Sequence, residues 1–146
     1  MKKINVALVG LGFGGAFAGI YKAHPNIGEL TLFDTNSDQA KRTCDFIGGA
    51  HIASSFEEIL SDPTIDAVHL VTPIPCHAEQ TVKVLNAGKH CACTVPMATS
   101  LEDIQAITDA VRRSGSYIEL HLLEGVGHSV TPVMREELVY WFNRFI

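Results

Sequence analysis

The sequence lacks the features that mark membrane, nucleic-acid-binding and metal-binding proteins. No run of residues approaches the roughly 20 apolar residues of a membrane span. Basic residues are scarce, 11 against 16 acidic ones, and a net charge of −5 disfavours a nucleic-acid surface. The seven histidines are scattered, and none forms a spaced ligand set with another histidine or cysteine. We therefore expect no membrane, nucleic-acid or metal partner for this chain.

Cysteine is also sparse, and its spacing excludes a redox or zinc motif. The four cysteines, Cys44, Cys76, Cys91 and Cys93, contain no C-x-x-C pair. In a reducing compartment such residues stay thiols and pack as small hydrophobic groups. Met-Lys-Lys leads directly into an apolar strand, which leaves no room for a signal peptide. These features predict a cytoplasmic protein.

A glycine-rich turn follows the first apolar run, Ile4–Val9, which is typical of a buried parallel strand. The turn contains five candidate cofactor-binding residues, Gly10, Gly12, Phe13, Gly14 and Gly15. Gly10 allows a tight turn, Gly12 lets a pyrophosphate approach the backbone, and Gly15 lets the next helix lie close to the strand. The helix start adds free N–H groups and a positive dipole end. This pattern predicts a dinucleotide site.

Asp34 stands at the end of the next apolar run, 30–33, nineteen residues after Gly15. A carboxylate at this spacing accepts hydrogen bonds from the adenosine ribose hydroxyls and repels a 2′-phosphate. We therefore expect NAD as the cofactor and a weaker fit for NADP. A glycine turn with only a structural role is the alternative interpretation.

The apolar pattern alternates strands and helices along the whole chain. Strands are expected at 4–9, 30–33, 50–53, 66–72, 90–94 and 117–123, and helices at 14–24, 36–46, 55–61, 77–86, 100–113 and 131–146. Asn36, Ser55 and Ser100 are expected helix caps, and Ser55 with Glu58 has capping-box spacing. This order predicts an α/β fold with one domain, 1–146. We expect a doubly wound, Rossmann-like, mostly parallel six-stranded sheet with helices on both faces.

Two further segments carry a family resemblance. Val71-Thr72-Pro73 is followed by His77, and Ala87-Gly88-Lys89-His90 leads into Thr94-Val95-Pro96-Met97-Ala98. Together with the glycine turn and Asp34, they resemble the N-terminal NAD(P)-binding domain of the glucose-fructose oxidoreductase and inositol dehydrogenase family, over residues 1 to about 115. The resemblance implies that Thr72, Pro73 and His77 line the cofactor cleft near the nicotinamide half. The alternative interpretation is that Pro73 and His77 only mark the transition from a strand to a helix.

Two departures from that family argue against catalysis by this chain. Val95 stands where many members have a lysine credited with a role at the reacting carbon, and valine cannot transfer a proton. The substrate domain of the family follows the cofactor domain for about as many residues again, whereas this chain ends at Ile146. We therefore expect no catalytic residue here. The surface left by the missing domain is expected to support homo-oligomers.

The tail resembles a different family. Residues 117–128, with His128, and the amphipathic helix after Pro132 are similar to the last strand, histidine loop and final helix of α/β-hydrolases. No G-x-S-x-G nucleophile motif accompanies His128, so hydrolase activity is not expected. A join near 114–117 suggests a chimera, with 1–115 the dinucleotide-binding portion and 116–146 completing the sheet. A natural truncated homologue with a drifted tail is the alternative.

Three functional hypotheses follow from these observations. The first is an NAD-binding Rossmann module of an oxidoreductase, without its substrate domain and not catalytic alone. The second is an engineered chimeric scaffold with a vestigial cofactor site. The third is a minimal NAD-dependent oxidoreductase, which requires His77 or His128 as a proton donor.

Overall fold

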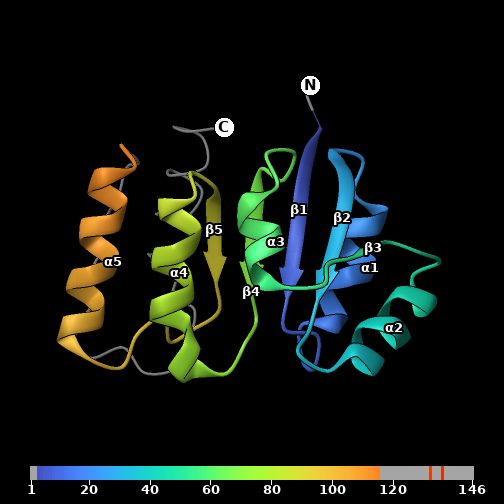
Figure 1. Cartoon of the computed structure of the whole chain (residues 1–146), viewed down its shortest axis with the longest axis horizontal. Coiled ribbons are helices and arrows are strands. Elements are labelled where there is room, and N and C mark those ends of the chain that lie inside the picture. The colour runs from blue at the N-terminus through green and yellow to red at the C-terminus, as the bar shows by residue number, and fades with distance from the viewer. Residues whose placement is uncertain (1–2, 116–131, 133–135, 137–146) are drawn as a thin grey trace.

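The computed structural model describes residues 3–115, 132 and 136. Within them lies a parallel five-stranded sheet in the order β3-β2-β1-β4-β5 (Figure 1). The strands are β1 (Ile4–Val9), β2 (Ile27–Phe33), β3 (His51–Ile52), β4 (Ala67–Leu70) and β5 (His90–Cys93). The predicted doubly wound α/β fold is confirmed. The expected sixth strand, 117–123, and the expected last helix lie outside the described residues, apart from two single positions.

Helices cover both faces of this sheet (Figure 1). They are α1 (Gly15–Ala23), α2 (Ser37–Phe46), α3 (Phe56–Ser61), α4 (His77–Asn86) and α5 (Leu101–Arg113), with a short 3-10 turn at Ile74–Cys76. The core is divided by β1, because neighbouring side chains of a strand point to opposite faces. Ala7 and Val9 pack toward α3 and α4, and Leu8 packs toward α1 and α2. Helix α5 packs on α4.

Strand β2 begins at Ile27, three residues before the predicted start. The added part contains Gly28, which lies opposite Asn5. The side-chain oxygen of Asn5 occupies the space that a Cβ at Gly28 would need, and it accepts the Glu29 N–H at 2.8 Å. Glycine is therefore required here by a close approach, and the strand continues through it.

The predicted caps are present at α2, α3 and α5. Asn36 Oδ1 accepts the N–H groups of Asp38 and Gln39, and Ser100 Oγ accepts that of Asp103. Ser55 Oγ accepts the Glu58 N–H at 3.0 Å, which is half of the expected capping box.

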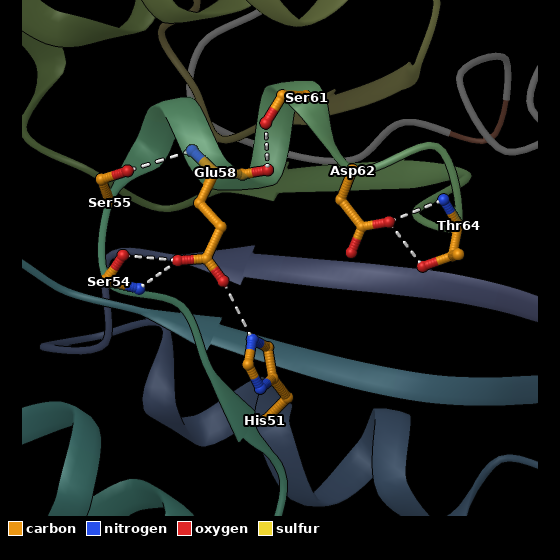
Figure 2. Close-up of polar contacts among 7 residues, drawn as sticks. All are labelled: His51, Ser54, Ser55, Glu58, Ser61, Asp62 and Thr64. Atoms are coloured by element: carbon orange, nitrogen blue, oxygen red, sulfur yellow. Dashed lines mark hydrogen bonds and ion pairs between the residues drawn. The ribbon is translucent and has the colours of Figure 1, made fainter.

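The prediction that the Glu58 carboxylate completes the capping box by accepting the Ser55 N–H is wrong. The Glu58 carboxylate reaches Ser54 instead of Ser55, with its Oε2 accepting the Ser54 N–H at 2.8 Å and the Ser54 hydroxyl at 2.5 Å (Figure 2). Its Oε1 lies 3.1 Å from His51 Nε2. The carboxylate gains two donors from Ser54, whereas the Ser55 backbone would offer only one.

These hydrogen bonds make Glu58 a source of acid sensitivity. The Ser54 hydroxyl, then the Ser54 N–H, lower the pKa of Glu58 from 4.5 to about 2. Because the pKa is depressed in the folded state, the stabilisation is present above about pH 4.5 and is lost as the pH falls toward about 2. We expect Glu58→Gln to flatten the fall in unfolding free energy over this interval, measured by urea unfolding at several pH values.

Glu57→Gln is the matched control, because Glu57 lies in the same first turn of α3 but makes none of these contacts. It should keep the acid dependence of the wild type. Equal slopes for the two variants would contradict the assignment to Glu58.

Candidate functional site

A cleft of about 490 Å³ opens at the carboxyl ends of the central strands. Its walls come from β1 and the glycine turn (Val9, Gly10, Gly12, Phe13), from the end of β2 (Phe33, Asp34, Thr35), and from the segment between β4 and α4 (Val71, Thr72, Pro73, Cys76, Gln80). The strand order places β1 between β2 and β4. The helix that follows β2, α2, packs on one face of the sheet, and the helix that follows β4, α4, packs on the other. This is the crevice where doubly wound sheets bind ligands.

Gly10 and Gly14 are required by the fold itself. Gly10 has a φ of +86°, and a Cβ there would lie 2.5 Å from the Val71 carbonyl oxygen. A Cβ at Gly14 would collide with the Gly10 carbonyl oxygen and lie 2.9 Å from Val71 Cβ. The two glycines let the start of α1 pass close to β4.

The role expected for Gly15 is therefore wrong. A Cβ at Gly15 would make only an ordinary contact, 3.4 Å from Thr43 Oγ1 on α2. Because α1 starts at Gly15, the close approach to the sheet is made one residue earlier, by Gly14. The sequence pattern indicated the crowded turn but not which glycine occupies its tightest point.

Gly12 differs from these glycines because it faces open space. A Cβ at Gly12 would meet no atom within 4 Å, and the residue lines the cleft. Among residues 3–115, no protein acceptor bonds the N–H groups of Gly12, Phe13 and Gly14. Three donors at the positive end of α1 next to unfilled space fit a pyrophosphate.

Asp34 lines the same cleft and also holds the turn in place. Its Oδ2 accepts the Leu11 N–H at 2.7 Å, and its Oδ1 accepts the Asn36 N–H at 2.8 Å. Gln39 Nε2 donates to the Leu11 carbonyl oxygen at 2.9 Å, so both backbone groups of Leu11 are bonded. A carboxylate oxygen accepts more than one hydrogen bond, so Asp34 keeps capacity for ribose hydroxyls. Its tethering of the turn had no signal in the sequence.

Thr72 and Pro73 line the cleft as expected from the resemblance, whereas His77 lies behind its wall. The His77 side chain is buried, with 1% of its surface exposed. Its Nε2 lies 2.7 Å from the Thr72 carbonyl oxygen and its Nδ1 lies 2.8 Å from the Pro96 carbonyl oxygen. His77 thus ties the segment after β4 to the segment after β5.

Six of the lining residues were not predicted from the sequence, and these are Val9, Phe33, Thr35, Val71, Cys76 and Gln80. Cys76 and Gln80 extend the wall begun by Thr72 and Pro73. They are four residues apart, with Cys76 at the end of the 3-10 turn and Gln80 in the first turn of α4, a spacing that places both on one side of a helix. The positions of Cys76 and Gln80 shortly after the expected site residue Pro73, four residues apart, were the sequence signal that could have identified them.

In the part of the chain that the structure describes, the other cysteine, histidine and acidic residues form no second site. All four cysteines are free, and burial raises the pKa of Cys91 to about 12 and also raises that of Cys93. Within residues 3–115, 132 and 136, no group of three or more His, Cys, Asp or Glu side chains could hold a metal. None of the helices in this part of the chain is long and apolar enough to cross a membrane. Val95, which stands where many members of the family that the sequence resembles have a lysine, is 81% exposed.

Comparisons with known proteins agree with this geometry. Residues 4–121 match the oxidoreductase family with an NAD-binding Rossmann fold. The chain is 31% identical over 101 residues to the 1,5-anhydro-D-fructose reductase of Ensifer adhaerens, covering 68% of this chain and 30% of that protein. It is 31% identical over 121 residues to the levoglucosan dehydrogenase of Pseudarthrobacter phenanthrenivorans, covering 77% and 31%.

Solved structures give the same result. A levoglucosan dehydrogenase in complex with NADH and levoglucosan matches with a TM-score of 0.71 and 30% identity, over 79% of this chain and 34% of that one. An NAD-binding protein from Listeria innocua matches with a TM-score of 0.71 and 31% identity, over 79% and 34%. The chain thus spans about a third of the length of these relatives. The family match, which covers most of the chain, and the glycine turn with Asp34 establish that this chain belongs to the NAD-binding Rossmann-fold oxidoreductase family.

Proposed function

We propose that this chain is the NAD-binding module of an oxidoreductase, with the dinucleotide bound across the turn 10–15 and Asp34. The observation that carries the proposal is the unfilled space at Gly12 beside three N–H groups that have no acceptor among residues 3–115. The pyrophosphate would be held there by these donors and the dipole of α1. Asp34 would receive the adenosine ribose hydroxyls, and its charge would oppose a 2′-phosphate.

Bound NAD supplies hydride transfer. Two residues that the sequence brought forward for a catalytic role do not supply a proton here, because Val95 is apolar and both ring nitrogens of His77 face backbone carbonyl oxygens behind the cleft wall. These observations favour binding without turnover by this chain. The hypothesis of a minimal oxidoreductase now rests on His128, which lies outside the described residues.

Calorimetric titration with NAD and NADP tests the proposal. We expect NAD to bind at least about tenfold more tightly than NADP, a difference of about 1.4 kcal/mol. Absence of heat up to millimolar NAD would overturn the proposal. Cooperative unfolding that NAD does not shift would favour the alternative, an engineered scaffold with a vestigial site, because a ligand of the native state must raise its stability.

Asp34→Asn should reduce the preference for NAD over NADP to about twofold or less, because the variant loses the charge that opposes the 2′-phosphate. The amide can still accept one of the two backbone hydrogen bonds that Asp34 accepts, so the fold is expected to persist. The preference is the ratio of the two calorimetric dissociation constants.

Asp38→Asn, on the first turn of α2 and outside the cleft lining, is the matched control. It should keep the ratio of the wild type. An unchanged ratio in Asp34→Asn would show that this carboxylate does not select the cofactor.

Three finer proposals accompany the first. A cytoplasmic location is supported by the four free cysteines. Self-association is supported by large apolar side chains at the surface, with Phe13, Leu101 and Val95 between 76% and 81% exposed. Light scattering that finds only a monomer at high concentration would overturn it. We propose the chimeric join near 114–117 from the resemblance of the tail sequence to α/β-hydrolases, and the match to the oxidoreductase family continues to residue 121.

A further inference from the structure

Gln80 presents an amide of fixed orientation to the cleft. It lies on α4 and lines the cleft from the side of β1 opposite to Asp34, which follows β2. The Thr72 hydroxyl donates to Gln80 Oε1 at 2.6 Å. Thr72 is itself held through its carbonyl oxygen, 2.7 Å from the buried His77 Nε2. This bond directs Oε1 toward Thr72, and no acceptor in residues 3–115 bonds Gln80 Nε2.

The surroundings of Gln80 suit a flat heteroaromatic ring. Val9, Phe33, Val71 and Pro73 give the cleft apolar walls. The polar side chains that line it are Asp34, Thr35, Thr72, Cys76 and Gln80. Among these five, only Gln80 offers an N–H donor and a carbonyl acceptor side by side. Adenine presents the complementary pair, an exocyclic amine next to a ring nitrogen, and glutamine is a common partner of that edge.

We infer that Gln80 recognises the adenine base of the bound dinucleotide. Its Nε2 donates to a ring nitrogen, and its Oε1 accepts from the exocyclic amine through the lone pair that Thr72 leaves free. The inference rests on the proposed function, since a ribose held by Asp34 carries its base into the same cleft. It places Thr72, which bonds Gln80, beside the adenine instead of beside the nicotinamide half that the resemblance implied. Gln80 is thus a specificity-determining residue for the base, as Asp34 is for the ribose.

Nicotinamide hypoxanthine dinucleotide tests this inference, because it differs from NAD by an oxygen in place of the exocyclic amine. In the wild type, Oε1 would face that oxygen, so NAD should bind at least about tenfold more tightly than the analogue. Gln80→Leu should bind both dinucleotides with a ratio near one. Both constants are measured by calorimetry on the full chain, with melting curves to confirm folding.

Gln105→Leu is the matched control, because Gln105 is exposed on α5 and bonds only Asp109 at 2.9 Å. It should keep the ratio of the wild type. Equal affinities of the wild type for NAD and the analogue would overturn the role of Gln80, and so would an unchanged ratio in Gln80→Leu. Either result would leave NAD binding intact, whereas failure of the wild type to bind either dinucleotide would overturn the proposed function and this inference together.

Discussion

Gly12→Val is expected to weaken NAD binding by about a hundredfold, or about 2.8 kcal/mol, without lowering the melting temperature. A Cβ at Gly12 meets no protein atom within 4 Å, so the fold has room for the side chain. That room lies over the free N–H groups of the turn and inside the cleft. The branched side chain would occupy the space proposed for the pyrophosphate and keep it from the backbone donors.

Gly19→Val provides the control for this prediction. A Cβ at Gly19 also meets nothing within 4 Å, but the residue lies on the exposed side of α1 and outside the cleft lining. Calorimetry should find wild-type affinity for NAD in this variant, and thermal melting should find both variants folded. Wild-type affinity in Gly12→Val would mean that the dinucleotide does not lie on this turn.

Gly10→Ala is expected to destabilise the fold by about 3 kcal/mol, because two penalties act together. The φ of +86° places a Cβ in a conformation that disfavours side chains. The same Cβ would lie 2.5 Å from the Val71 carbonyl oxygen, 2.7 Å from its carbonyl carbon and 2.9 Å from the Thr72 nitrogen. These are backbone atoms directly after β4, an interior strand, and they cannot move without disturbing the sheet.

Gly48→Ala separates the two penalties. Gly48 has a similar φ of +74°, but a Cβ there meets nothing within 4 Å. Its substitution should cost about 1 kcal/mol, from the backbone conformation alone. Urea unfolding measures both values, and equal losses for the two variants would show that the contact with Val71 is not important.

The sequence was most informative where local patterns decide the structure. The strand Ile4–Val9 and the helix His77–Asn86 were predicted with their observed bounds, because buried apolar runs and helix ends have strong local signals. The caps Asn36 and Ser100 were predicted for the same reason. The start of β2 was predicted three residues late, because the place of Gly28 in the strand depends on its packing against the distant residue Asn5.

The arrangement of the site depended on contacts between distant segments. The bond from Leu11 to Asp34 and the place of His77 behind the cleft wall arise only when the strands lie side by side. Lys89 also makes contacts between distant segments, because its buried ammonium group donates to the carbonyl oxygens of Asp62 and Ile65. His77 and Lys89 both lie in the segments that carry the family resemblance, and in the structure both bond backbone carbonyl oxygens of loops around the sheet.

NMR of the isotopically labelled chain during titration with NAD tests most directly whether the dinucleotide lies on the turn between β1 and α1. The N–H groups of Gly12, Phe13 and Gly14 are expected to show the largest chemical-shift changes, because they would exchange solvent for phosphate oxygens. Saturation with NAD that leaves these three signals in place, or that moves signals elsewhere instead, would contradict the proposed site.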